Sequence, residues 1–93
     1  MNLNEDKNMI YKIRRKSDGY ILASDSLSFI PNNGKNIGRR FKTEKGAKKK
    51  IAFITLTDEM EKEGLPDFYI QGHIENYGSL DPNDFEVVTE EWG

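Results

Sequence analysis

The stretch MIYKIRRKSDGYILAS, residues 9–24, alternates apolar and polar side chains and then turns back on itself. Met9, Tyr11 and Ile13 fall on one side of an extended chain, which is the period-two pattern of a strand. Lys12 falls on the other side. The SDG triplet that follows supplies turn chemistry, because a glycine after aspartate accepts a positive φ. The sequence therefore predicts an antiparallel hairpin over residues 9–24.

Downstream of the hairpin, residues 25–38 are rich in serine, asparagine, glycine and proline, a composition typical of a long loop. A short strand is expected within this loop around residues 27–30. Residues 38–42 are expected to form a further short strand, with Phe41 directed inward between basic neighbours.

A helix is predicted to follow over residues 44–62. Thr43 is a good N-cap, and Glu44 places a negative charge in the first turn, where it opposes the positive end of the helix dipole. Gly64 would stop the helix. The spacing by four and three predicts one buried apolar ridge and a solvent-facing lysine side. The ridge consists of Ala47, Ile51 and Ile54.

The end of the chain is predicted to complete a sheet. Residues 67–74, rich in aromatic and β-branched side chains, are expected to form a strand, residues 76–83 a connection, and residues 85–92 a last strand. The expected fold class is α+β, a mostly antiparallel sheet of four to five strands with one helix packed across it. Residues 1–93 are expected to form a single domain, with residues 1–8 as a flexible leader.

Composition limits the kind of protein. The 93 residues suit one core, and 35% hydrophobic residues argue against a disordered tail. There is no cysteine, so disulfides and thiolate metal sites are excluded. No apolar run has the length of a membrane span, and the first residues lack the order of a signal peptide. We expect a soluble, cytoplasmic protein that does not bind membranes.

The small net charge of −2 hides a strong asymmetry along the chain. Residues 1–50 hold 13 Lys/Arg and 5 Asp/Glu, whereas residues 51–93 hold one cation and 11 carboxylates. If the fold separates the halves, each becomes a charged surface suited to recognition. The alternative is that strands from the two halves are neighbours and their charges pair across the sheet.

Catalytic constellations are missing from the sequence. His73 is the only histidine and there is no cysteine, so nucleophilic pairs have at most one base. We expect His73 to be a half-exposed structural residue of its strand. Neither an EF-hand pattern nor a phosphate-binding glycine loop occurs. The prediction is a protein that is not an enzyme and has no cofactor and no metal site.

The order of short motifs resembles a family. The strand YKIRRK, the turn SDG, the return YILAS, the strand FKT and the helix start GAKKKI together resemble small tailed-phage proteins of unassigned function, over residues 11–51. The closing FEVVTEEW is similar to their acidic terminal strand. The resemblance transfers no catalytic residues. It implies a phage setting, a host cytoplasm, and binding of a host or defence factor.

Two functional hypotheses follow. The first is a protein–protein interaction module that binds and inhibits or redirects a host or anti-phage defence protein, with an acidic surface offered to a nucleic-acid-binding enzyme. Its candidate contacts are Asp58, Glu59, Glu61, Glu63, Glu86, Glu90, Glu91 and Trp92.

The alternative is a small nucleic-acid-binding or transcription-modulating protein that uses the basic half. Its candidate contacts are Arg14, Arg15, Arg39, Arg40, Lys42, Lys48 and Lys49. Steep loss of affinity with rising salt would distinguish phosphate binding from protein binding. A third possibility, a structural virion component, predicts self-association.

Overall fold

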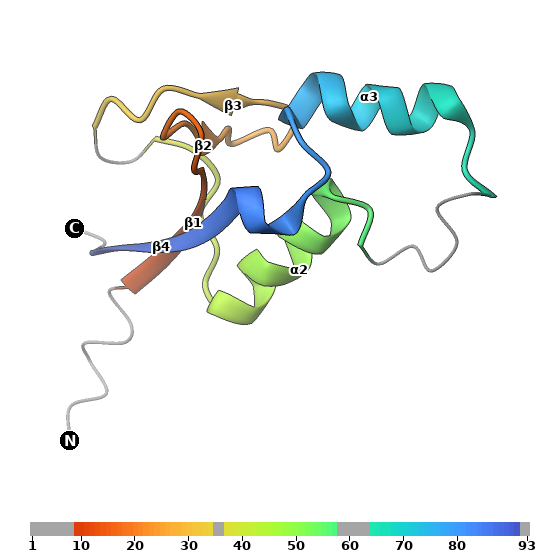
Figure 1. The fold of residues 1–93 in the computed structure, drawn as a ribbon. Helices are drawn as coiled ribbons and strands as arrows, with labels where there is room; N and C mark the ends of the chain where they lie inside the picture. The colour runs from red at the N-terminus through yellow and green to blue at the C-terminus, as the bar shows by residue number, and fades with distance from the viewer. Residues whose placement is uncertain (1–8, 35–36, 58–63, 92–93) are drawn as a thin grey trace.

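Four antiparallel strands form the sheet of this computed structural model, which describes residues 9–34, 37–57 and 64–91. The strand order is β3-β2-β1-β4, and within these described residues two α-helices accompany the sheet (Figure 1). The α+β class and the antiparallel sheet are confirmed. The strands are β1 (Met9–Arg15), β2 (Ile21–Leu22), β3 (Phe29–Ile30) and β4 (Phe85–Glu91).

The predicted hairpin is present, formed by β1 and β2. Arg14 pairs with Ile21 in antiparallel register, and the N–H of Arg15 donates to the carbonyl of Tyr20 at 2.7 Å. Gly19 has φ +77°, the left-handed conformation that the turn requires. Local turn chemistry therefore sets this part of the fold.

The longest pairing joins the two ends of the described chain. β1 and β4 run antiparallel over their full lengths, from Met9 opposite Glu91 to Arg15 opposite Phe85. A basic strand from the first half thus lies beside an acidic strand from the second half. The predicted last strand is confirmed to Glu91, and Trp92 lies outside the described residues.

The segment between β2 and the first helix is less regular than predicted. The strand expected over residues 38–42 is reduced to a single bridge, in which the N–H of Tyr11 donates to the carbonyl of Phe41 at 2.9 Å. Gly38 has φ +89°, and a Cβ added there would lie 2.7 Å from the carbonyl oxygen of Leu22. The chain passes too close to β2 at this point for any side chain.

Helix α2 (Glu44–Ile54) begins where the sequence predicts. The side chain of Thr43 accepts a hydrogen bond from the N–H of Gly46 at 3.0 Å, so the N-cap prediction is confirmed. The helix ends earlier than predicted. The Thr55 hydroxyl donates to the carbonyl of Ile51 at 2.8 Å, and Leu56 has φ +60°, which stops a right-handed helix.

Residues 67–74 form a helix, and the predicted strand was wrong. Helix α3 (Asp67–Tyr77) starts after Pro66, which is tolerated at a helix start, and ends at Gly78, which has φ +90°. Tyr69, His73 and Tyr77 recur at helical spacing and their rings contact one another along one side, so packing overrides their strand propensity. The described residues form two α-helices where one was predicted. Neither they nor any other described segment forms a helix long and apolar enough to cross a membrane.

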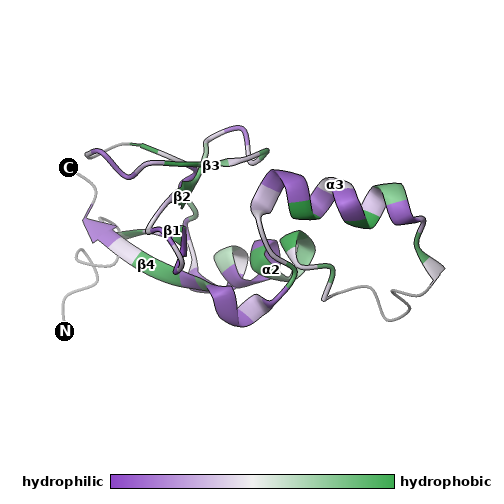
Figure 2. Cartoon of the chain, turned by 45° about the horizontal axis from the view of Figure 1, so that its top comes forward, coloured by the Kyte–Doolittle hydropathy of each residue, from purple (hydrophilic) through white to green (hydrophobic). Residues whose placement is uncertain are grey.

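The core lies between the sheet and α2, which packs on β1 and β4. The predicted apolar ridge of α2 is confirmed as buried. Figures 1 and 2 show that α3 extends away from the sheet, so only its C-terminal part joins the core. The core residues are Ile13, Leu22, Phe29, Ala47, Ile51, Ile54, Tyr77 and Phe85.

Candidate binding surfaces

The acidic strand β4 uses its carboxylates within the molecule. Glu86 forms an ion pair with Arg14, and a carboxylate oxygen of Glu90 accepts from Nζ of Lys12 at 2.7 Å. Glu91 is exposed at the end of the strand. Glu86 and Glu90, two of the predicted partner contacts, therefore form ion pairs within the sheet. Asp58, Glu59, Glu61, Glu63 and Trp92 lie outside the described residues.

Some charges of the basic half and of the acidic half pair with each other across the sheet. The register of β1 and β4 places opposite charges next to each other, as expected if the two halves are sheet neighbours. Lys12 is only 2% exposed, although its position in the alternating pattern suggested a polar face. A buried ammonium ion needs a partner, and Glu90 provides it.

The arginines of the hairpin are also engaged. Arg15 donates from Nε and Nη2 to the Asp18 carboxylate, at 3.1 and 2.7 Å, and from Nη1 to the carbonyl of Tyr77 at 2.9 Å. The hydrogen bond from Arg15 holds the pKa of Asp18 below its usual value. Arg14 thus connects β1 to β4, and Arg15 connects β1 to the turn and to the end of α3, so both guanidinium groups already have partners.

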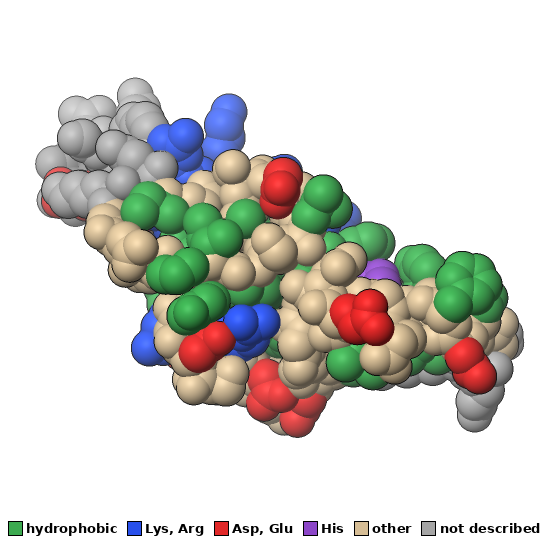
Figure 3. Space-filling model, turned by 90° about the horizontal axis from the view of Figure 1, so that it is seen from above, with side chains coloured by type: hydrophobic (Ala, Val, Ile, Leu, Met, Phe, Trp, Pro, Cys, Tyr) green, Lys and Arg blue, Asp and Glu red, His purple; other side chains and the backbone are tan. Residues whose placement is uncertain are grey.

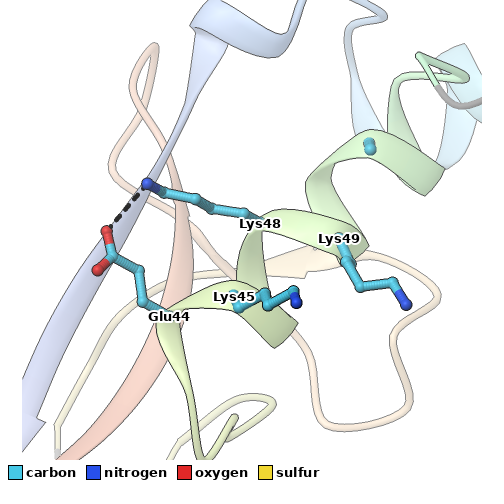
Figure 4. A pocket seen from close by; sticks show the side chains of 5 residues that line it. Glu44, Lys45, Lys48 and Lys49 are labelled. Carbon is cyan, nitrogen blue, oxygen red and sulfur yellow. Dashed lines mark ion pairs between the residues drawn. The ribbon is translucent and has the colours of Figure 1, made fainter.

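Helix α2 carries what we call the lysine face, defined as Lys45, Lys48 and Lys49. At about 100° per residue these positions span an arc of about 100° on the side away from the core, and all three are exposed. Figure 4 shows Lys45 and Lys49 extending to the same side, whereas Lys48 reaches back to Glu44 at 3.2 Å. That pair is exposed and weak.

A shallow depression of about 480 Å³ lies along the lysine face. Its lining residues are Glu44, Lys45, Lys48, Lys49 and Ala52. Two further predicted cations, Arg40 and Lys42, are exposed in the segment that leads into α2. The depression is open and cationic, which suits an extended anionic ligand better than an enclosed small molecule.

A second cationic group lies on the flank of α2. We call it the cation–aromatic cluster: Arg39, Phe41, Lys50 and Phe53. Nζ of Lys50 lies 4.3 Å from the centre of the Phe53 ring, and Cζ of Arg39 lies 5.2 Å from that of Phe41. Both distances are those of cation–π contacts. Burial, and next the charge of Arg39, lower the pKa of Lys50.

Sequence reasoning missed Lys50 and Phe53. Lys50 follows Lys49 by 100° around the helix and so leaves the lysine face, while Phe53, three residues on, returns to the same flank. The three-residue spacing of Lys50 and Phe53 on a helix could have predicted this contact.

His73 is a structural residue of α3, buried where half-exposure in a strand was predicted. Its Nδ1 lies 2.9 Å from the carbonyl oxygen of Ile54, which only accepts, so Nδ1 carries the proton. Aromatic rings of Phe53, Tyr69 and Tyr77 surround it at 5.0–5.5 Å. Within residues 9–34, 37–57 and 64–91, no group of three His, Cys, Asp or Glu is arranged to hold a metal ion.

Helix α3 exposes apolar side chains that the sequence analysis did not identify as candidates. Phe68 is 79% exposed and Ile74 is 37% exposed. Figure 3 shows hydrophobic side chains at the far end of this helix, with carboxylates beside them. Exposed aromatic residues on a projecting helix are a feature of protein contact surfaces.

Comparisons with protein-family models, with curated proteins and with solved structures gave no match. The resemblance to tailed-phage proteins stays a prediction. The function has to be inferred from the two cationic groups of α2, the paired acids of β4 and the apolar end of α3.

Proposed function

We propose that this protein is a non-enzymatic module that binds nucleic acid through the lysine face and the basic segment that precedes α2. One observation carries the proposal. Residues 38–50 hold seven cations and one carboxylate, Glu44, and they form helix α2 up to Lys50 together with the segment that leads into it. Of the acids on β4 that would oppose a polyanion, Glu86 and Glu90 are paired with β1, and Glu91 is exposed.

Binding would follow from charge and counterion release. Lysines and arginines that neutralise phosphates release the cations condensed on a nucleic acid, which gives affinity without sequence readout. Lys45 and Lys49 extend to one side of α2 and suit successive phosphates of one strand. No described element carries a base-reading motif, so we expect weak sequence preference.

The experiment is fluorescence anisotropy with labelled single-stranded DNA, double-stranded DNA and RNA at low salt. The double variant Lys45→Gln/Lys49→Gln removes two cations of the lysine face. We expect it to bind roughly tenfold more weakly, because each phosphate contact contributes to affinity.

The matched control is Lys16→Gln, which removes an exposed cation of the hairpin turn. It should bind within about twofold of the wild type. Absence of binding by the wild-type protein at low salt would overturn the proposal, as would equal binding by the double variant.

A second candidate function is binding of a host or defence protein, and the exposure of Phe68 favours it. The acidic contacts predicted for it are weakened, because Glu86 and Glu90 are paired within the sheet. The apolar end of α3 would replace them. A partner captured by the wild type should be lost with Phe68→Asp and kept with Lys45→Gln/Lys49→Gln; the opposite pattern would exclude this surface.

A further inference from the structure

We propose that Arg39, Lys50 and Phe53 form a subsite for one unpaired nucleotide, with its phosphate between the two cations and its base against the Phe53 ring. This inference rests on the proposed function and makes it specific, because it names single-stranded nucleic acid as the ligand class.

Arg39 lies near enough to Lys50 for its charge to act on the ammonium group. In the described part of the chain, no Asp or Glu lies within ion-pair distance of Arg39 or Lys50. Arg39 is fixed by the Phe41 ring and by a hydrogen bond from Nη1 to Oγ of Ser26 at 3.2 Å. The position of Arg39 thus does not depend on a counter-ion.

Lys50 is destabilised in its charged form. Its ammonium group is partly removed from water and faces the charge of Arg39, and both effects lower its pKa. A phosphate between the two side chains would relieve both effects, because it solvates the ammonium ion and screens the repulsion. The subsite therefore favours a dianionic or monoanionic phosphate over a neutral ligand.

Phe53 offers an aromatic surface next to these cations. The side chain is 43% exposed, although it lies on a helix whose neighbouring apolar residues are buried. Its ring packs on His73, with centres 5.3 Å apart, and His73 is fixed by the carbonyl of Ile54. Nζ of Lys50 also lies over this ring, 4.3 Å from its centre, so a base would stack on the ring as Lys50 moves from the ring to the phosphate.

Stacking on Phe53 requires a base whose face is free. In a duplex both faces of each base are covered by neighbours, so insertion would cost unstacking energy. In a single strand the bases are accessible, and stacking on aromatic side chains tolerates any sequence. Lys49 precedes Phe53 by one helical turn and would hold the next phosphate along the strand.

The test uses a labelled oligothymidine of about 12 nucleotides and the matching duplex, with anisotropy at low salt. Phe53→Leu removes the ring and keeps most of the apolar volume. We expect roughly tenfold weaker binding of the single strand and unchanged binding of the duplex. Phe68→Leu is the matched control, because Phe68 is an exposed aromatic residue on α3, and it should bind within about twofold of the wild type.

A second variant, Lys50→Gln, keeps the proposal testable if Phe53→Leu unfolds. It should weaken single-strand binding and reduce the salt slope by about one contact. The nucleotide subsite is excluded, and the proposed function kept, if Lys45→Gln/Lys49→Gln weakens binding while Phe53→Leu and Lys50→Gln do not. The same conclusion follows if the duplex binds at least as tightly as the single strand. If the wild type binds neither nucleic acid, the proposed function fails with it.

Discussion

At the scale of the residue, Lys12 is the clearest case of a buried charge that depends on a partner from a distant strand. It is almost fully buried in β1, and Glu90 of β4 lies 2.7 Å from its ammonium group. Desolvation of a lysine is costly, so removal of the partner should be expensive even though the pair itself adds little to stability.

The variant Glu90→Gln tests this account. We expect the free energy of unfolding, measured with urea, to fall by about 2 kcal/mol, because Lys12 stays buried and loses its counter-ion. Glu91→Gln, at an exposed neighbouring position, should change it by less than about 0.5 kcal/mol. Equal stabilities for the two variants would show that Lys12 does not depend on Glu90.

Tyr77 gives a second prediction at the residue scale. Its hydroxyl donates to the carbonyl of Ser26 at 2.8 Å, and burial raises the pKa of the phenol above 10.0. Tyr77→Phe should lower the free energy of unfolding by about 1 kcal/mol at neutral pH, since the Ser26 carbonyl loses its donor.

The raised pKa of Tyr77 also predicts that its contribution to the free energy of unfolding depends on pH. The pKa of Tyr77 is higher in the folded protein than in the unfolded chain, where it is near 10. The stabilisation by the Tyr77 hydroxyl is therefore complete below this unfolded-state pKa and is lost as the pH rises through the folded-state pKa. The stability difference between wild type and Tyr77→Phe should therefore shrink above about pH 10. A constant difference across this range would contradict burial of the ionisable hydroxyl.

At the scale of the element, local signals predicted some parts and failed at others. The hairpin and the start of α2 were predictable because an SDG turn and the Thr43 cap act within a few residues. The end of α2 and the whole of α3 were not, because their β-branched and aromatic residues suit either structure. Tertiary contacts decide: His73 bonds the last residue of α2, and Tyr77 packs against Phe29.

Gly72 tests the helical state of residues 67–77. A Cβ added there meets nothing within 4 Å, so Gly72→Ala should raise the free energy of unfolding by about 0.5–1 kcal/mol through helix propensity. Gly38→Ala is the contrasting variant. Its left-handed φ and the nearby Leu22 carbonyl should make it destabilising by about 2 kcal/mol or more. A loss of stability with Gly72→Ala would contradict α3.

At the scale of the whole molecule, the register of β1 against β4 determines which charges are available. Sequence reasoning found the basic candidates because residues 38–50 are contiguous, but it could not know that Glu86 and Glu90 face cations on a strand more than 70 residues away. Glu86 and Glu90 of β4 form ion pairs within the sheet and Glu91 is exposed, whereas of the lysines of α2 only Lys48 forms an ion pair among the described residues. This imbalance is the physical basis of the proposed nucleic-acid surface.

The salt dependence of binding to single-stranded DNA tests that surface most directly. If the lysine face and the cation–aromatic cluster together contact three or four phosphates, the logarithm of the binding constant should fall linearly with the logarithm of salt concentration, with a slope of about −2 to −3. No binding at the lowest salt, or a slope near zero, would contradict the account and leave the apolar end of α3 as the working surface.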